Sequence, residues 1–324
     1  MNWGIYSASG ISNKYIDALQ AEGETVYAIA SRSAERAWEY KNKYSIIKEY
    51  SNYDDLINDK NIDIVYVSNV NSHHCNAVIS CIEAGKHVVC EKPMAISAEE
   101  ARQMTQCAKR NNKFLMEAMW TRAQPIFKDI RKLVSDGVIG EVTRVWADFS
   151  FVSARDPERR LLNYELGGGA IYDIGIYSLM LILDFLGLDV KNVRASGFIG
   201  DTGVDEDATV LINYGNGKMG IMTNSFISPR PQMAVITGTE GMIKIPGFIG
   251  ADRSEVIFFK NNENAGYELN SPCVENKFRY QVRHAVECVR NGKLESDLIP
   301  WSHSVKAAEI IDKALLDIRG EKDV

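Results

Sequence analysis

Several features that mark whole classes of proteins are scarce or missing in this chain of 324 residues. Basic residues are not in excess, because 37 lysines and arginines face 43 aspartates and glutamates, and no block of like charges stands out. A nucleic acid or an anionic membrane would therefore meet no attractive field, so we expect neither as a partner. Internal repeats and low-complexity linkers are also missing, which favours an ordinary globular chain.

Cysteine pairs and long apolar runs are missing as well. None of the six cysteines forms a CxxC pair, and no segment approaches 18 uninterrupted apolar residues. The N-terminus has no leader of the signal-peptide type, so we expect a cytoplasmic protein with reduced thiols. His73-His74-Cys75 looks like a metal cluster, but adjacent residues of a helix cannot all point at one ion, so no metal site is predicted.

The first part of the chain alternates between strand and helix patterns. Strands are expected at residues 2–7, 25–30, 62–67, 88–90 and 114–119, and helices at 11–20, 33–44, 72–85 and 97–110. Ser33 can cap the second of these helices, and Ser97 with Glu100 has the spacing of a capping box. This alternation predicts an α/β fold with a doubly wound parallel sheet of the Rossmann type, over residues 1–119.

From Glu141 onward the pattern changes to strands without long helices between them. Apolar and polar residues alternate over 144–151, and further strands are expected at 208–214, 218–225, 233–237, 242–245 and 256–259. Short Gly/Asn connections predict antiparallel hairpins. Residues 120–324 are therefore expected to form an α+β domain with a large, mostly antiparallel open sheet, with helices at 123–136, 278–290 and 302–318. Trp146 on the polar face suggests a homodimer through that face.

Lys92 follows a buried run, Val88-Val89-Cys90, at the carboxyl end of a predicted parallel strand. Ligands bind outside this edge of a doubly wound sheet. A lysine there can hydrogen-bond a substrate hydroxyl and stabilise the negative charge that develops when the hydroxyl loses its proton. The alternative is an exposed lysine in a loop that Pro93 stiffens.

The turn after the first strand is where a dinucleotide would place its pyrophosphate, in front of a helix N-terminus. In place of G-x-G-x-x-G the chain has Ser7-Ala8-Ser9-Gly10-Ile11-Ser12. Serine keeps the small size that a close approach needs, but it does not suit a position that requires positive φ. The turn alone is therefore a poor match to the dinucleotide pattern.

Two arginines stand near the end of the second strand, where NAD-binding sheets usually carry an acid. Arg32 and Arg36 are four residues apart and can share one helical face beside a 2′-phosphate, with Ser31 and Ser33 as hydroxyl donors. The alternative is a pair of solvated arginines on a surface helix. NADP(H) is the favoured cofactor, and NAD(H) is possible.

A glycine run, Gly167-Gly168-Gly169, opens an apolar helix that is expected to extend to about Phe185. Glycines let the backbone come close to a ligand. Asp173 and Tyr177 are i and i+4 on this otherwise apolar helix, so we expect them to face the same way. The alternative is that Asp173 pairs locally while Tyr177 packs in the core.

Taken together, these motifs resemble the glucose-fructose oxidoreductase / inositol dehydrogenase family (Gfo/Idh/MocA) over nearly the whole chain. Within it the chain is most similar to the branch of dimeric dihydrodiol dehydrogenases and NADP-linked D-xylose dehydrogenases. The matching features are Trp3-Gly4-Ile5, the Gly10-Ile11-Ser12 turn, Asn71 with His74, Glu91-Lys92-Pro93, the run from Met116 to Arg122, and Gly168-Gly169-Ala170 with Asp173-Ile174-Gly175-Ile176-Tyr177.

The resemblance implies that Lys92 and Tyr177 are a catalytic pair, with Asp173 as an orienting group. A phenol has a pKa near 10, so Tyr177 needs the nearby charge of Lys92 and of an oxidised nicotinamide to act as a base. The resemblance also implies two sets of binding residues. The cofactor set is Ser7, Ser9, Gly10, Ile11, Arg32, Arg36, Asn69, Asn71, His74, Glu91 and Lys92; the substrate-pocket set is Trp120, Arg122, Phe151 and Tyr177.

The predicted function is hydride transfer between NADP and a secondary hydroxyl or anomeric carbon of a small sugar, polyol or diol. Two alternatives stay open: a nicotinamide-dependent glycosidase of the same family, and a regulatory protein that binds NADP or sugar without turnover. The serine-substituted turn departs from the family pattern, as does Ala123-Gln124, where related chains carry aromatic residues. The dihydrodiol substrate is therefore not carried over.

Overall fold

The computed structural model describes residues 1–260, 263–271 and 273–320. Contacts divide the chain into two compact units, which are described separately. Unit 1 contains Met1–Trp120 and Val274–Ser304, and unit 2 contains Thr121–Cys273 and the segment from Val305 onward. The expected division into domains 1–119 and 120–324 stays a prediction, whereas these contacts group Val274–Ser304 with the N-terminal segment.

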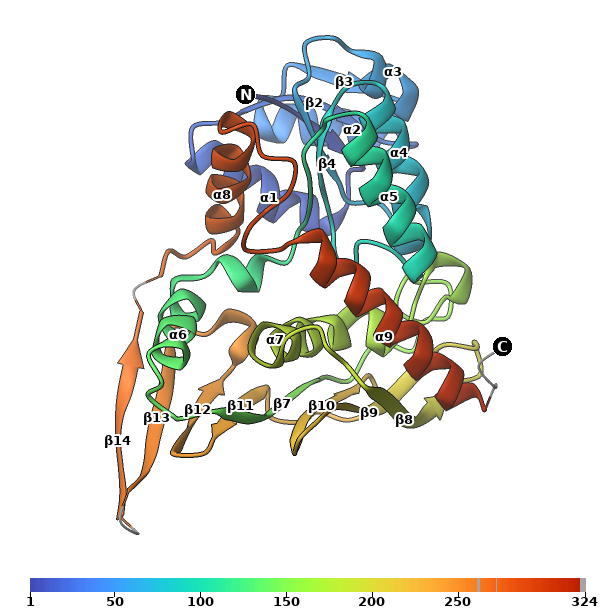
Figure 1. The fold of residues 1–324 in the computed structure, drawn as a ribbon. Helices are drawn as coiled ribbons and strands as arrows, with labels where there is room; N and C mark the ends of the chain where they lie inside the picture. The colour runs from blue at the N-terminus through green and yellow to red at the C-terminus, as the bar shows by residue number, and fades with distance from the viewer. Residues whose placement is uncertain (261–262, 272, 321–324) are drawn as a thin grey trace. The chain divides into compact units, whose positions relative to one another are not determined.

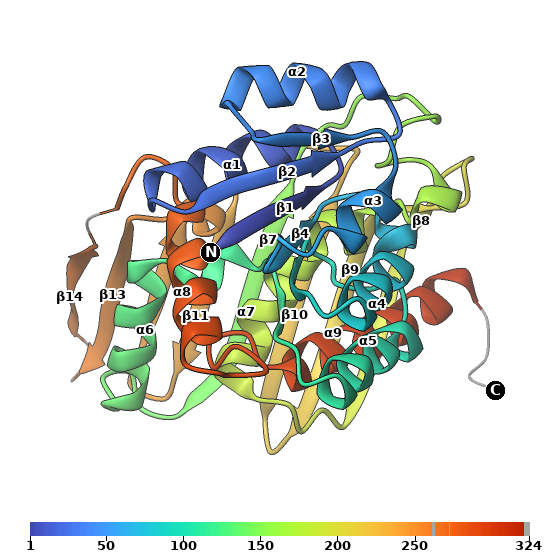
Figure 2. The same ribbon diagram turned by 90° about the horizontal axis from the view of Figure 1, so that it is seen from above.

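Unit 1 is built on a parallel sheet in the strand order β3-β2-β1-β4-β5-β6. Figure 2 shows β3, β2, β1 and β4 side by side in this order. The order reverses between β1 and β4, as it does in the Rossmann fold, so the predicted doubly wound sheet is confirmed. The strands are β1 (Asn2–Tyr6), β2 (Thr25–Ala30), β3 (Lys48–Tyr50), β4 (Ile64–Val67), β5 (His87–Cys90) and β6 (Leu115–Glu117).

Two helices of unit 1, α2 (Ala34–Tyr44) and α5 (Ala98–Arg110), begin at the residues that the capping signals predict. Ser33 accepts a hydrogen bond from the Arg36 amide, and Ser97 accepts one from the Glu100 amide. Glu100 completes its half of the cap on the amide of Ile96 rather than on that of Ser97. The helices are α1 (Gly10–Ala21), α2 (Ala34–Tyr44), α3 (Tyr53–Asn58), η1 (Asn71–His73), α4 (His74–Glu83), α5 (Ala98–Arg110) and α8 (Phe278–Arg290).

The short pair β3 and α3 was not predicted from the sequence. Lys48–Tyr50 is three residues long with half-buried side chains, too short to show a strand period. Helix α8 was predicted with the right bounds, and it lies beside α1 (Figure 1). Arg279 and Arg283 of α8 both form ion pairs with Glu22, just after the end of α1.

Unit 2 is built on a mostly antiparallel sheet in the order β14-β13-β12-β11-β7-β10-β9-β8, which can be followed across Figure 1. Its strands are β7 (Val142–Ser150), β8 (Asn192–Ile199), β9 (Asp205–Gly215), β10 (Lys218–Ser225), β11 (Met233–Gly238), β12 (Gly241–Pro246), β13 (Arg253–Lys260) and β14 (Glu263–Asn270). Its helical segments are η2 (Trp120–Ala123), which begins at the last residue of unit 1, α6 (Pro125–Ser135), η3 (Tyr164–Leu166), the π-helical turn η4 (Ile171–Gly175), α7 (Ile176–Leu186) and η5 (Phe248–Gly250). Helix α9 (Trp301–Arg319) begins in unit 1 and continues in unit 2.

Two parts of this sheet differ from the hairpin prediction. Strands β7 and β10 pair in parallel at the centre of the sheet, although β9 and β10 form the expected hairpin. Turn residues reveal pairing between neighbours in sequence, and they carry no information about strands as far apart as β7 and β10. Strands β8 and β14 were not predicted, because β8 is largely exposed and β14 lacks a regular apolar period.

Helix α7 covers one face of the unit 2 sheet (Figure 1). Gly220 of β10 allows this close approach, because a Cβ there would lie 2.4 Å from Ile182 of α7. The stretch Tyr164–Leu186 is long and apolar enough to cross a membrane by length and composition, yet 78% of its window is buried in the protein. That burial is typical of a core helix.

The other face of the sheet carries a row of apolar side chains. Leu211 pairs with Ile221, which pairs with Trp146, which pairs with Val235, so the row crosses β9, β10, β7 and β11. Leu211 is exposed, and the other three are partly exposed. Apolar residues therefore lie on the face that the sequence suggested for dimerisation.

Candidate active site

The turn after β1 has a backbone that the sequence pattern did not anticipate. Ser7 stands where the dinucleotide pattern has its first glycine, and it adopts φ of 100°, the region that favours glycine. The expectation that serine does not suit such a position is therefore wrong for Ser7. Its amide donates to the carbonyl of Ala30 on β2, which helps to hold the turn in this conformation.

At positions where the dinucleotide pattern has glycine, this turn has serines whose hydroxyl groups form hydrogen bonds within it. Ser12, at the third glycine position, is fully buried, and its Oγ donates to the carbonyl of Ser7 at 2.8 Å. The same hydroxyl lies 2.9 Å from the Oγ atoms of Ser9 and Ser68. Ser68 follows β4, so the network joins the two loops that flank the point where the strand order reverses. Ser12 was quoted only as part of the turn and Ser68 was not singled out, because the partners of a buried hydroxyl leave no signal in the sequence.

The first turn of α1 faces open space. Gly10 is exposed, and a Cβ built on it would meet no atom within 4 Å. Ser9 caps the helix, and Ile11 is half-buried beside Gly10. A helix N-terminus with an open position at its first residue leaves room for the pyrophosphate of a dinucleotide, because the first amides of a helix have no partner within it.

Arg32 and Arg36 follow the end of β2 and are both exposed, which fits a phosphate site and the alternative of solvated arginines alike. Ser31 is buried and accepts a hydrogen bond from the Ser33 amide, and Ser33 caps α2. In the part of the chain that the structure describes, no salt bridge engages either guanidinium. Both charges are therefore available to a phosphate at this edge of the sheet.

His74 lies between the loops that follow β4 and β5. Its ring is fully buried, with Nδ1 2.9 Å from the Pro93 carbonyl and Nε2 3.2 Å from the Asn69 carbonyl. Burial lowers the pKa of His74 to about 4, so the ring is neutral and can donate to only one of the two carbonyls. The shorter contact favours Pro93. These contacts hold the loop after β5, and they engage the ring that was predicted as a cofactor contact.

Asn69 and Asn71 also lie in the loop after β4. The Oδ1 atom of Asn69 is buried and accepts no hydrogen bond from the described residues, and its Nδ2 makes only a long contact of 3.4 Å to the His73 carbonyl. A buried acceptor without a donor costs stability unless a ligand supplies one. Asn69 therefore fits the cofactor set. Asn71 is half-buried at the start of η1.

Two buried carboxylates fix the loop that carries Lys92. Glu91 accepts the amide of Lys92 at 3.1 Å and the hydroxyl of Tyr66 at 2.5 Å. Glu117 at the end of β6 accepts the amide of Met94 at 2.9 Å and the hydroxyl of Ser304 at 2.6 Å. Lys92 is half-buried and stands between these anchored positions. Glu117 belongs to the motif from Met116 to Arg122, but its hydrogen bond to the loop after β5 was not predicted.

In unit 2, the glycine run approaches protein atoms. A Cβ on Gly168 would lie 2.8 Å from the carbonyl oxygens of Arg160, Leu161 and Asn163. Gly169 has φ of 131°, and a Cβ there would lie 2.3 Å from Oδ1 of Asp205. These contacts explain both glycines without a ligand.

Asp205 anchors the start of the helix that these glycines precede. Its Oδ2 accepts the amide of Ile171 at 2.7 Å. The carboxyl group is fully buried, and burial raises its pKa to about 7. No role was assigned to Asp205 from the sequence, where it reads as one acid among several before a strand.

Asp173 and Tyr177 are both buried at the start of the apolar helix. Asp173 forms an ion pair with Arg160 at 2.7 Å, which agrees with the local pairing considered as an alternative. Tyr177 lies beside the Phe149 ring, with centroids 5.8 Å apart. Together with Arg122 it lines a cavity, and Arg122 forms a buried ion pair with Asp184.

The remaining predicted pocket residues take part in aromatic contacts. Phe151 is half-buried, with its ring centroid 5.2 Å from that of Phe226, in a hydrophobic cluster of unit 2. Trp120 stacks on Phe278 within unit 1, with centroids 5.2 Å apart. The structure thus brings the predicted cofactor residues to one edge of the unit 1 sheet, and Arg122 and Tyr177 to one cavity of unit 2.

Sequence profiles match most of the chain. A profile described as an oxidoreductase family with an NAD-binding Rossmann fold matches residues 1–119, and the GFO/IDH/MocA C-terminal domain matches residues 127–244. The trans-1,2-dihydrobenzene-1,2-diol dehydrogenase of Danio rerio is 35% identical over 324 residues, which cover 97% of this chain and 96% of the relative.

Solved structures share the fold over nearly the full length. An aldose-aldose oxidoreductase from Caulobacter crescentus, complexed with glycerol, is 26% identical with a TM-score of 0.88, and the match covers 99% of this chain and 98% of that one. A levoglucosan dehydrogenase in complex with NADH and levoglucosan is 20% identical with a TM-score of 0.90 and the same coverage.

Proposed function

Because this chain belongs to the Gfo/Idh/MocA family of NAD(P)-binding oxidoreductases, we propose that it is an NADP-dependent dehydrogenase or reductase of small sugars, polyols or diols. The reacting group would be a secondary hydroxyl or an anomeric carbon. The observation that carries the proposal is Lys92, held by buried carboxylates on a loop at the carboxyl edge of a nucleotide-binding sheet. Ligands of such sheets bind at this edge.

The proposed reaction needs a cation and a proton acceptor at one substrate oxygen. Lys92 would donate a hydrogen bond to this oxygen and stabilise its developing negative charge. Tyr177 would take the hydroxyl proton, and a nearby cation favours the ionised phenol. The bound nicotinamide would accept or supply the hydride. Asp173 is proposed to orient the site, and its ion pair with Arg160 holds it at the start of the helix that carries Tyr177.

The preference for NADP is proposed from Arg32 and Arg36. Their guanidinium groups are exposed at the end of β2, and no acid occupies the adjacent positions Ser31 and Ser33. A carboxylate there would bind a ribose 2′-hydroxyl and repel a 2′-phosphate, whereas arginine binds the phosphate in a bidentate manner.

The test of function is a coupled pair of measurements. Purified protein is incubated with NADP⁺ and a panel of pentoses, hexoses, inositols and diols, and NADPH formation is followed. Tyr177→Phe should lower kcat by about 10²–10⁴-fold while NADPH still binds, because only the proton acceptor is lost. Tyr164→Phe removes an exposed phenol outside the cavity and is the matched control. Full activity in Tyr177→Phe would refute the assignment of the base.

The cofactor proposal has its own test. The double variant Arg32→Ala/Arg36→Ala should weaken NADPH binding at least about 10-fold while NADH binding changes little, because only NADPH carries the 2′-phosphate. Arg110→Ala, at the exposed end of α5, is the control for a general loss of positive charge. An unchanged NADPH to NADH ratio in the double variant would sink the 2′-phosphate assignment.

We also propose a homodimer through the open face of the unit 2 sheet, in a cytoplasmic enzyme. The apolar row Leu211, Ile221, Trp146 and Val235 supports the interface, because a second copy of the chain would remove these side chains from water. Ile221→Lys should shift the mass measured by light scattering from dimer to monomer. Ile47→Lys, which charges an exposed apolar position of unit 1, should leave the mass unchanged.

A further inference from the structure

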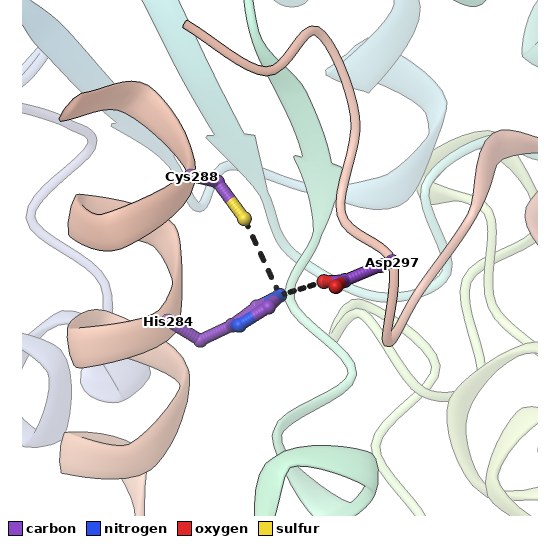
Figure 3. A group of neighbouring side chains, drawn as sticks. All are labelled: His284, Cys288 and Asp297. Carbon is purple, nitrogen blue, oxygen red and sulfur yellow. Dashed lines mark hydrogen bonds and ion pairs between the residues drawn. The ribbon is translucent and has the colours of Figure 1, made fainter. Parts of the chain in front are cut away.

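His284, Cys288 and Asp297 meet in unit 1 at the end of α8 (Figure 3). His284 and Cys288 are i and i+4 on the helix, so they share one face. Asp297 lies in the loop that follows. The Nε2 atom of His284 is 3.5 Å from Sγ of Cys288 and 3.4 Å from Oδ1 of Asp297. The three possible ligand atoms all lie within 4.8 Å of one another.

These separations match the edges of a tetrahedral zinc site. With Zn–S of about 2.3 Å and Zn–N or Zn–O of about 2.0–2.1 Å, tetrahedral angles place sulfur about 3.5 Å from nitrogen and nitrogen about 3.4 Å from oxygen. The separations of His284 Nε2 from Cys288 Sγ and from Asp297 Oδ1 therefore equal the expected edges. A cation bound at Nε2 would displace the Ser296 hydroxyl, which lies 2.8 Å from the same nitrogen.

The histidine nitrogen is in the form that a metal requires. Ser296 accepts the amides of Leu298 and Ile299 on its Oγ, so its own proton is directed to Nε2 of His284, 2.8 Å away. Nε2 is therefore an acceptor with a lone pair. A metal would exchange one neutral hydrogen bond for a metal–nitrogen bond.

The two oxygens of Asp297 have separate partners. Lys293 contacts Oδ2 at 3.1 Å, whereas Oδ1 faces His284. The carboxylate can therefore give one oxygen to a metal while it keeps its ion pair. The thiol of Cys288 would release its proton to solvent as the metal–sulfur bond forms.

We propose that His284, Cys288 and Asp297 form a Zn²⁺ site with water as the fourth ligand. A nitrogen, a thiolate and a carboxylate are a ligand set that suits this borderline-soft ion. The ion would join α8 to the loop before α9 and so stabilise unit 1. The site is separate from the residues proposed for hydride transfer, and its test does not depend on activity.

The experiment uses the full chain after treatment with a chelator. Co²⁺ serves as a spectroscopic probe and should bind with one equivalent, giving the visible bands of a tetrahedral ion and a thiolate-to-metal charge-transfer band. Zn²⁺ should displace it. Cys288→Ser should abolish the charge-transfer band, whereas Cys273→Ser, which removes an exposed thiol elsewhere, should leave it intact.

A second variant covers the case in which Cys288→Ser, a buried change, does not fold. Asp297 is largely exposed, so Asp297→Asn should fold, as checked by circular dichroism, and should bind Co²⁺ at least about 10-fold more weakly. Zn²⁺ should raise the melting temperature of the wild type more than that of this variant. Absence of the charge-transfer band in the wild type, or unchanged Co²⁺ affinity in folded Asp297→Asn, would overturn the proposal.

Discussion

The turn after β1 and the segment before α7 differ in how many glycines they contain and in what those glycines contact. In both, the contacts are the opposite of what the number of glycines suggests. The turn has serine at all three glycine positions of the dinucleotide pattern, yet a Cβ at Gly10, the first residue of its helix, would meet no atom within 4 Å. The segment before α7 is rich in glycine, yet Gly168 and Gly169 approach carbonyl oxygens and Asp205.

The comparison separates two uses of a small residue. A glycine that faces protein atoms is needed for packing, and its replacement damages the fold. A glycine that faces open space can be replaced without such damage, and any penalty falls on the ligand. The atom that a Cβ would meet therefore distinguishes the two uses, and the number of glycines does not.

The largest effect is expected for Gly169→Ala. The new Cβ would lie 2.3 Å from Asp205 at a φ of 131°, so both packing and backbone oppose it. We expect a loss of about 3–5 kcal/mol in the free energy of unfolding, measured with a chemical denaturant. Gly10→Ala, which meets nothing, should stay within about 0.5 kcal/mol of the wild type. Equal losses in the two variants would break the comparison.

Asp205 should make the stability of the segment before α7 depend on pH. Because its folded pKa of about 7 is above the unfolded value, its contribution is full below about pH 4 and is lost as pH rises through 7. We expect the wild type to lose roughly 2–4 kcal/mol of unfolding free energy from this group between pH 4 and 8. Asp205→Asn should remove that part of the slope, and an unchanged slope would contradict the assignment.

A smaller effect of opposite sign is expected for Ser7→Gly. Relief of the positive φ at Ser7 should raise the free energy of unfolding by about 1 kcal/mol, since its hydroxyl forms no hydrogen bond with the described residues that would be lost. Ser9→Gly is the matched control, because Ser9 has φ of −95° and its hydroxyl contacts Ser12. Calorimetry should give a higher melting temperature for the first variant and a lower one for the second.

The sequence predicted the fold well where local signals and topology agree. The caps Ser33 and Ser97, the strand-helix alternation and the β9–β10 turn all depend on neighbours in sequence. The parallel pairing of β7 with β10 depends on residues far apart, so no local pattern could reveal it. Membership of the oxidoreductase family followed from whole motifs and is confirmed.

The candidate site was predictable in its residues but not in its contacts. Lys92 and Tyr177 were found as chemistry-bearing residues, whereas Glu117, Ser12 and Asp205 act through hydrogen bonds to backbone groups. Such roles are set by tertiary packing, because any buried carboxylate or hydroxyl must find a partner. Catalytic roles for Lys92 and Tyr177 stay predictions.

The most direct test of the central claim, that the serine turn holds the dinucleotide, is NADPH binding to Gly10→Asp and Gly10→Asn. An acid at the start of α1 suits the helix dipole, so Gly10→Asp should fold with normal stability. Its charge and size should nevertheless exclude a pyrophosphate. We predict that fluorescence titration gives a dissociation constant at least about 100-fold higher for Gly10→Asp than for the wild type, with a smaller increase for Gly10→Asn. Wild-type affinity in Gly10→Asp would contradict the account.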